Sequence, residues 1–234
     1  MMKEFSNRYI FIFSSVMVIV VATLLSLAAT VLQPRQLKNL EIEKKKSMLE
    51  SIGIASIRET TENLYDKYIN RSFVLNSKDE VVDGINAFDV VLSDEQKKPL
   101  DQQYFPVFIS STDNGEMVTI LPVQGKGLWG PIYGYVSLKS DMNTIYGVTF
   151  DHKGETPGLG AEINTTAFES MFPGKKLYDG DKFVSIGVIK GGAKPGDTHD
   201  VDAISGGTIT SKGLEKMLLD CIVKYNDYLI KNRN

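Results

Sequence analysis

The sequence predicts an α+β protein, in which a single N-terminal transmembrane helix precedes a compact domain with a mostly antiparallel sheet and flanking helices. Three observations support this fold class. Residues 9–34 form an uncharged, apolar run. Short segments of strand-like pattern are grouped between residues 73 and 189, and an amphipathic helical pattern follows them. Strands grouped together, with helices at the ends of the group, are typical of α+β folds and not of doubly wound parallel sheets.

The apolar run over residues 9–34 predicts a membrane anchor. About 20 predominantly apolar residues cross a bilayer, so the run is long enough to span it with some tilt. The apolar core of a cleaved signal peptide is shorter, about 7–15 residues, which favours an anchor that is retained. Residues 1–8 then form a short N-terminal tail.

A count of the charged residues beside the anchor favours a cytoplasmic domain. Lys3 and Arg8 precede the run, whereas Arg35, Lys38 and residues 44–46 add five basic residues after it. Basic residues favour the cytoplasmic side, although long domains cross membranes largely regardless of charge. Acidic residues are interspersed with these basic ones, which is typical of a solvated helix face.

Residues 35–72 are predicted to form a helical connector that packs on the domain, with a break at Gly53. The domain itself is predicted over residues 73–234, with a short helix around residues 165–171 and a terminal helix after Thr208. Seven segments have the alternation and the flanking turn residues of strands. They are residues 73–75, 87–92, 107–109, 117–123, 132–138, 145–150 and 183–189.

Composition argues against several classes of function. The 26 basic and 29 acidic residues give a net charge of −3, without the basic excess of a nucleic-acid-binding protein. Cys221 is the only cysteine, so a disulfide within the chain is impossible. His152 and His199 are the only histidines, too few for a His-based metal site, and neither lies in a catalytic motif. We therefore expect no nucleic-acid partner, no resident metal and no catalytic residue.

The segment from Asp202 to Thr208, with the sequence DAISGGT, has the pattern of an attachment site for a phosphate-bearing cofactor. Gly206 and Gly207 allow a tight turn and close backbone approach. A helix that begins here would point free N–H groups at an anion. Asp202 is placed to orient a hydroxyl or to hold a metal during a transfer reaction. The alternative is an ordinary turn in which Thr208, Thr210 or Ser211 is only the N-cap.

Two further loops have features of ligand-binding segments. Residues 125–130 fit the string G-x-G-x-x-G, but Pro131 and a strand pattern follow where a dinucleotide site requires a helix. Trp129 in this loop is expected either to pack on the core or to cover a ligand. The loop over residues 155–162 offers Thr156, Gly158 and Leu159 to a planar ligand, with backbone amides for its polar edge and Leu159 for its face.

Taken together, the anchor and the motifs GKGLWGP (125–131), GETPGLG (154–160) and DAISGGTITS (202–211) resemble the C subunits of the Na+-translocating NADH:quinone oxidoreductases. The motifs occur in the order of that family, and the resemblance covers nearly the whole chain. It implies an FMN-binding domain whose FMN is phosphoester-linked to Thr208 by a separate flavin transferase. Ser205, Gly206 and Gly207 match the acceptor loop, with Gly207 standing where the family usually has Ala. Thr156, Gly158 and Leu159 match the loop against the isoalloxazine ring.

The resemblance also implies a function and a location. The chain would relay electrons from NADH towards quinone through its FMN, coupled to Na+ export, as one subunit among others of a bacterial inner-membrane complex. Its domain would face the periplasm, against the charge count. The isolated chain would be an electron carrier, because it lacks a nicotinamide site. Two alternatives remain open: the covalent-FMN subunit of an Rnf-type ferredoxin:NAD+ oxidoreductase, and a membrane-anchored binding module without a redox role.

Overall fold

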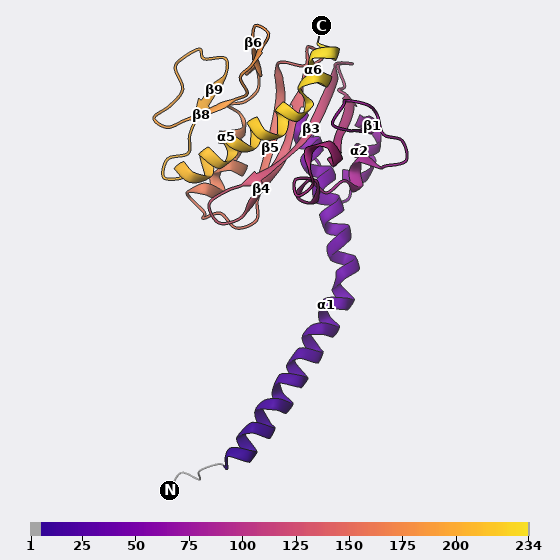
Figure 1. Ribbon diagram of the computed structural model, residues 1–234, viewed down its shortest axis with the longest axis vertical. Helices are drawn as coiled ribbons and strands as arrows, with labels where there is room; N and C mark the ends of the chain where they lie inside the picture. The colour runs from indigo at the N-terminus through magenta and orange to yellow at the C-terminus, as the bar shows by residue number, and fades with distance from the viewer. Residues whose placement is uncertain (1–5, 234) are drawn as a thin grey trace. The chain divides into compact units, whose positions relative to one another are not determined.

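The structure, a computed structural model, describes residues 6–233 of the chain (Figure 1). Residues 1–5 of the predicted N-terminal tail and Asn234 lie outside the described residues. The chain divides into two units, Met1–Lys44 and Lys45–Asn234, which are described separately.

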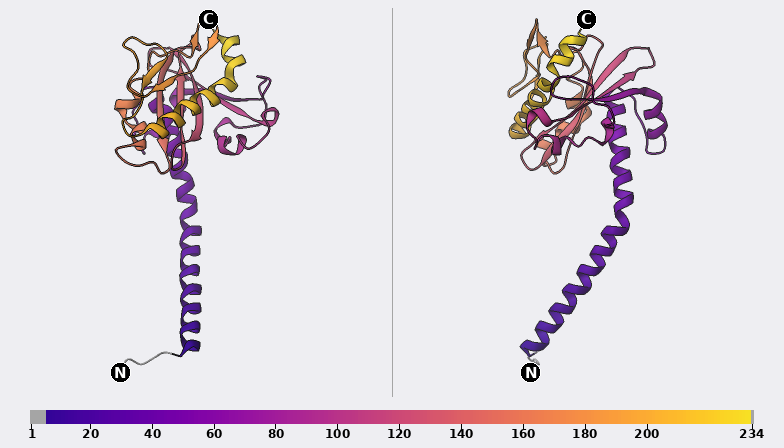
Figure 2. Two further views of the ribbon diagram at one scale, coloured as in Figure 1. Left: turned by 60° about the vertical axis from the view of Figure 1, so that its left-hand side comes forward. Right: turned by 45° about the vertical axis from the view of Figure 1, so that its right-hand side comes forward.

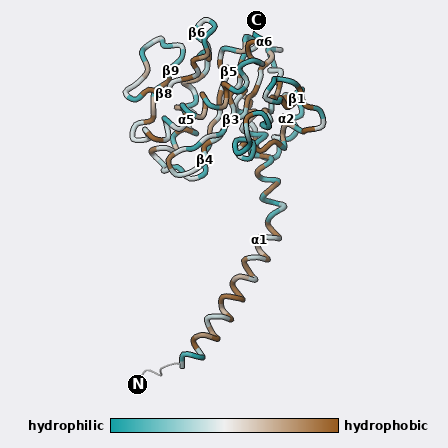
Figure 3. The backbone as a smooth tube through the Cα atoms, viewed as in Figure 1, coloured by the Kyte–Doolittle hydropathy of each residue, from teal (hydrophilic) through white to brown (hydrophobic). Residues whose placement is uncertain are grey.

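Helix α1 (Asn7–Ser51) accounts for the first unit and contributes its last residues to the second. The helix is long and apolar enough to cross a membrane, and its most apolar window is not buried within the protein. Figure 3 shows this apolar stretch in brown along the N-terminal part of the helix. Exposed apolar side chains on all sides of a helix need an apolar environment. The predicted apolar N-terminal helix is therefore confirmed.

The second unit is built on a five-stranded antiparallel sheet in the order β1-β2-β3-β4-β5, so each strand pairs with its neighbour in the chain (Figures 1 and 2). The strands are β1 (Ile69–Leu75), β2 (Phe105–Ser111), β3 (Met117–Lys126), β4 (Pro131–Leu138) and β5 (Ile145–His152). This sheet and its flanking helices confirm the α+β fold class.

Two small sheets follow the main one. β6 (Tyr178–Asp179) and β7 (Lys182–Phe183) form an antiparallel hairpin, whereas β8 (Gly187–Ile189) and β9 (Asp200–Asp202) pair in parallel. The chain then enters α5 (Thr208–Ile222), a 3-10 turn η4 (Val223–Tyr225) and α6 (Asn226–Asn232).

Each face of the main sheet has its own apolar core, because successive side chains of a strand point to opposite faces. On one face, Leu121, Val123 and Val136 pack with the buried stripe of α5, which includes Leu214 and Leu218. The other face carries a second cluster around the C-terminal end of α1 and α2 (Thr61–Tyr68). Its buried members are Met48, Leu49, Ile52, Tyr68, Val74, Ala87, Phe108, Val118, Ile120 and Tyr135.

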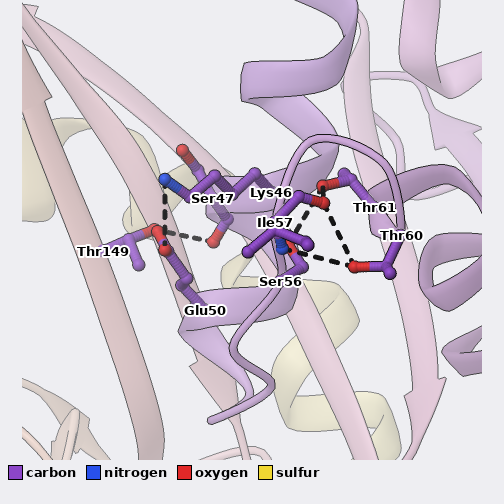
Figure 4. A network of polar contacts seen from close by, with 8 residues as sticks. All are labelled: Lys46, Ser47, Glu50, Ser56, Ile57, Thr60, Thr61 and Thr149. Carbon is purple, nitrogen blue, oxygen red and sulfur yellow. Dashed lines mark hydrogen bonds and ion pairs between the residues drawn. The ribbon is translucent and has the colours of Figure 1, made fainter.

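Hydrogen bonds attach the last turn of α1 to this second face. The Thr149 hydroxyl of β5 donates to the Ser47 carbonyl over 2.9 Å, beside an ion pair between Lys46 and Glu50 (Figure 4). The buried hydroxyls of Ser51 and Ser137 lie 2.7 Å apart. These contacts satisfy polar groups that burial would otherwise leave unpaired.

The predicted helix break at Gly53 is confirmed. Helix α1 ends at Ser51, and Gly53 has a φ of +78°, a conformation that favours glycine. The chain turns there and is held by a contact between the hydroxyls of Ser56 and Thr61 (3.1 Å; Figure 4) before α2 begins.

Two of the predicted strands are wrong as stated. Residues 87–92 form the 3-10 turn η1 (Ala87–Asp89) and the start of α3 (Leu92–Glu95), because the Asn86 side chain caps a helical turn by accepting the Phe88 N–H. Residues 183–189 are divided between β7 and β8, since Ser185 has a φ of +62°, which interrupts an extended chain. The other five predicted strands lie within β1 to β5.

The remaining short helices are α4 (Thr166–Glu169), η2 (Leu100–Gln102) and η3 (Gly160–Asn164). The Thr165 side chain caps α4 by accepting the Phe168 N–H, and α4 is shorter than the helix predicted around residues 165–171. Its last residue, Glu169, accepts a hydrogen bond from the Phe150 N–H over 2.8 Å. Burial is the main cause that raises the pKa of Glu169 to about 7, assisted by the neighbouring carboxylates of Glu50 and Asp151.

This raised pKa predicts a pH-dependent stability. The ordinary pKa of the carboxyl group is 4.5, so between pH 4.5 and about 7 the folded state holds the proton more tightly than the unfolded state. Stability from this group is therefore greatest at low pH and falls as the pH rises through that window. Glu169→Gln should raise the melting temperature more at about pH 8 than at about pH 5.5. An equal difference from the wild type at both values would contradict the prediction.

Candidate functional site

Helix α5 begins at Thr208, immediately after the two glycines of the DAISGGT motif. Gly206 has a φ of +75°, which turns the chain sharply into the helix. Gly207 is the N-cap, and no side-chain hydrogen bond caps the helix. The interpretation of Thr208, Thr210 or Ser211 as the N-cap is therefore wrong. The first N–H groups of a helix have no partner within it, so this end favours an anion.

The three hydroxyls in the first turn of α5 have different environments. The Thr210 hydroxyl is buried and donates to the Glu155 carboxylate over 2.5 Å. The Ser211 hydroxyl is also buried and accepts the Ile204 N–H over 3.1 Å. Thr208 is exposed, and its hydroxyl makes no hydrogen bond within residues 6–233. Among the three, only Thr208 presents a hydroxyl that is free to react.

The loop over residues 155–162 meets the turn at Gly206 and Gly207 through Leu159. A Cβ atom added to Gly206 would lie 2.6 Å from Leu159 Cδ2, and one added to Gly207 would lie 3.3 Å from the Leu159 carbonyl carbon. Leu159 is nevertheless 42% exposed, so part of its side chain is available to a ligand. Two motifs that are far apart in the sequence therefore lie against each other.

The conformation of this loop is set by its own backbone. The Thr156 carbonyl accepts the N–H groups of Leu159 and Ala161, each over 3.1 Å. Gly158 has a φ of +74°, and its N–H donates to the Glu162 carboxylate over 2.9 Å. The Thr156 side chain is exposed. This turn presents Thr156, Gly158 and Leu159 at the surface.

The loop over residues 127–130 also lies at the start of α5. The Trp129 N–H donates to the Glu155 carboxylate over 2.8 Å, and the Gly127 N–H donates to the Gly130 carbonyl over 2.8 Å. The Trp129 ring is 70% exposed, so it does not pack on the core. Close approach of α5 to this loop occurs at Gly213, where an added Cβ would collide with the Lys126 carbonyl oxygen.

Glu155 is the residue that the sequence reasoning missed. It is only 5% exposed, and its carboxylate accepts hydrogen bonds from both the Thr210 hydroxyl and the Trp129 N–H. Burial alone would raise the pKa of Glu155, but these bonds and one from the Gly130 N–H hold that pKa below its ordinary value. The only sequence signal was its position at the start of a glycine-containing loop.

Asp202 is the last residue of β9, and its carboxylate contacts a neighbouring loop. Its carboxylate accepts the Ala193 N–H over 2.7 Å and lies against Gly192. It therefore holds the glycine-rich loop over residues 191–196 next to β9. Lys190 and Lys194 in and beside that loop are exposed.

Comparisons with known proteins identify the family. The FMN-binding domain family matches residues 127–223, which include all three loops and the start of α5. The C subunit of the Na(+)-translocating NADH-quinone reductase from Vibrio vulnificus (strain YJ016) is 32% identical over 216 residues, which cover 84% of this chain and 83% of that protein. The corresponding protein from Pasteurella multocida is 35% identical over 207 residues, covering 80% and 78%.

The chain belongs to this family of C subunits. A crystal structure of the family member from Parabacteroides distasonis agrees, with a TM-score of 0.78 and 38% identity over 85% of this chain and 96% of that one. The protein is thus a membrane-anchored subunit of an NADH:quinone oxidoreductase and carries an FMN-binding domain. This assignment favours the Na+-translocating complex over the Rnf-type complex and over a binding module without a redox role.

The residues present at the site fit FMN, which combines a phosphate with a planar ring. The N-terminus of the 15-residue helix α5 suits the phosphate. Leu159, Trp129 and Ile209 are 42%, 70% and 59% exposed, which leaves apolar surface for the ring.

The close approach at Gly213 predicts that alanine at this position destabilises the protein. Gly→Ala inside a helix normally stabilises a protein by up to about 1 kcal/mol, because alanine loses less backbone freedom. Gly213→Ala should instead destabilise the protein, since the new methyl group would collide with a backbone carbonyl. Gly154→Ala is the control, with nothing within 4 Å of its added Cβ. The measurement is the free energy of unfolding in denaturant. A value for Gly213→Ala equal to that of the wild type would contradict the account.

Proposed function

We propose that FMN is joined to this chain by a phosphoester bond between its phosphate and the hydroxyl of Thr208. One observation carries the proposal: Thr208 presents an exposed, unpartnered hydroxyl in the first turn of α5, while the hydroxyls of Thr210 and Ser211 are buried and hydrogen-bonded. Ser205 is also exposed, so it is the nearest competing acceptor.

A separate flavin transferase is proposed to make the bond. The chain itself offers the hydroxyl, and the phosphate must come from a flavin nucleotide whose phosphate carries a leaving group. The bond from Thr208 Oγ1 to phosphorus forms as the bond from phosphorus to the leaving group breaks. The hydroxyl proton passes to a base of the transferase. Gly206 and Gly207 keep the acceptor turn free of side chains, which gives the second enzyme access to the hydroxyl.

The residues around Thr208 are proposed to hold and orient the bound group. The free N–H groups at the start of α5 face the phosphate, and Leu159 contacts the ring, with the backbone of residues 156–158 beside its polar edge. FMN can take up one or two electrons, so it can connect carriers of different electron number. The chain would thereby relay electrons from NADH towards quinone within its complex, coupled to Na+ export.

The domain is further proposed to face the periplasm, with the other subunits of the complex as partners. The family assignment supports an inner-membrane complex, and α1 supplies the anchor. The basic residues that follow the anchor do not oppose this orientation strongly, because a domain of this length crosses membranes largely regardless of flanking charge.

Intact mass spectrometry tests the attachment. The protein, coexpressed with its flavin transferase, should gain the mass of FMN less water, and Ser205→Ala should gain the same increment. Thr208→Val should gain none, because valine keeps the shape of threonine without its nucleophilic oxygen. An increment retained by Thr208→Val, or absent from the wild type, would overturn the proposal.

Cysteine labelling in intact cells tests the orientation. Lys182→Cys places a thiol on the exposed β6–β7 hairpin, and Ser6→Cys places one at the other end of the anchor. A reagent that crosses only the outer membrane should label Lys182→Cys directly and Ser6→Cys only after the inner membrane is opened. The native Cys221 is buried and serves as the background control. The reverse pattern of labelling would place the domain in the cytoplasm.

A further inference from the structure

A single buried carboxylate lies where the loops over residues 127–130 and 155–162 meet the start of α5. Glu155 Oε2 accepts the Thr210 hydroxyl over 2.5 Å, and Glu155 Oε1 accepts the Trp129 N–H over 2.8 Å. The Glu155 N–H itself donates to His152 Nδ1 over 3.2 Å. Thr210 is 55 residues away in the sequence and Trp129 is 26 away, so one side chain connects three distant segments.

Two glycines, Gly127 and Gly160, lie directly against the carboxylate of Glu155. A Cβ atom on Gly127 would lie 2.5 Å from Oε1, and one on Gly160 would lie 2.5 Å from Oε2. The glycines on both sides let the two loops close directly onto the carboxylate. A side chain larger than hydrogen at either position would displace the carboxylate from this arrangement or push the loops apart.

The hydrogen bonds from Thr210 and Trp129 require an acceptor at each of the two carboxylate oxygens. An ionised carboxylate accepts at each oxygen, whereas a glutamine amide has one accepting oxygen and one donating NH2 group. In Glu155→Gln, the amide oxygen can keep the Trp129 N–H, but the NH2 group then faces Thr210 Oγ1, which can no longer donate to a carboxylate oxygen. An ionised carboxylate therefore gives the stronger arrangement, because it accepts from both donors and its charge strengthens each bond.

We propose that Glu155 is a positioning residue for the flavin site. Through Thr210 it fixes the first turn of α5, so that Thr208 projects freely into solvent, and through the Trp129 N–H it holds the Trp129 loop beside that turn. This inference rests on the proposed attachment of FMN to Thr208. Thr210, which donates to Glu155, is two residues from Thr208. A flavin joined to Thr208 would therefore lie near the Glu155 charge, which would oppose the gain of negative charge on reduction.

The test compares substitutions at both ends of the hydrogen bond between Thr210 and Glu155 with a matched control. Glu155→Gln removes the charge, Thr210→Val removes the hydroxyl, and Thr210→Ser retains it. The control is Glu95→Gln, because Glu95 is 8% exposed and likewise accepts a backbone N–H, that of Tyr104, over 3.0 Å. Each full-length protein is coexpressed with the transferase and measured for FMN incorporation, flavin midpoint potential and thermal unfolding.

Glu155→Gln and Thr210→Val should each slow FMN incorporation by about tenfold, typical of losing a hydrogen bond to a charged group. The flavin that does attach to Glu155→Gln should have a more positive midpoint potential than in the wild type. Thr210→Ser should incorporate FMN at the wild-type rate, and Glu95→Gln should keep both the wild-type rate and the wild-type potential, whatever its melting temperature.

Two results would overturn the inference while leaving the attachment intact. One is wild-type incorporation and potential in Glu155→Gln; the other is equal loss in Glu155→Gln and Glu95→Gln, which would show only general destabilisation. A wild-type protein without FMN would instead overturn the proposed attachment, and this inference with it.

Discussion

The close packing of α5 on β3 and on the loop that follows β3 is the constraint on which the site depends. The buried stripe of α5, including Leu214 and Leu218, lies on one face of the sheet. Gly125 and Gly213 allow the two backbones to approach where any side chain would collide with Met217 or with the Lys126 carbonyl. Because the helix cannot slide or rotate against these contacts, its N-terminus has a fixed place. Thr208 is the first residue of that helix, so the packing positions the proposed acceptor.

Polar contacts then distinguish the hydroxyl of Thr208, the proposed acceptor, from those of Thr210 and Ser211. The Thr210 hydroxyl points inward and donates to Glu155, and the Ser211 hydroxyl accepts the Ile204 N–H. Both hydroxyls therefore stabilise the fold. Thr208 points outward, next to free helix N–H groups and the partly exposed Leu159. Buried hydrogen bonds thus provide rigidity on one side of the helix turn, while the other side stays open to a cofactor and to a transferase. The same turn serves both purposes because successive helix residues face different directions.

Local patterns in the sequence were sufficient for much of the fold. The uncharged run predicted the apolar part of α1, alternation predicted segments of all five strands of the main sheet, and apolar spacing after Thr208 predicted α5. The prediction failed at residues 87–92, where an Asn86 cap outweighs a strand-like pattern, and at Ser185, where a left-handed residue interrupts an extended segment. Both features depend on single residues that a pattern of hydrophobicity does not record.

The site was predictable only in part, for a related reason. Local glycines and hydroxyls, together with the family resemblance, indicated the turn at Gly206 and Gly207 and the loop at Leu159. The role of Glu155 depends on partners 26 and 55 residues away, which no local pattern brings together. Asp202 likewise bonds to Ala193 across a loop, a contact that sequence spacing does not suggest.

The most direct test of the account is to locate the flavin on the chain by fragmentation mass spectrometry. A peptide spanning residues 191–212 contains Thr208 together with the competing hydroxyls of Ser205, Thr210 and Ser211. We expect fragments that divide between Gly207 and Ile209 to place the whole FMN mass on Thr208. A modified fragment that excludes Thr208, or an unmodified peptide from protein matured with its transferase, would contradict the account.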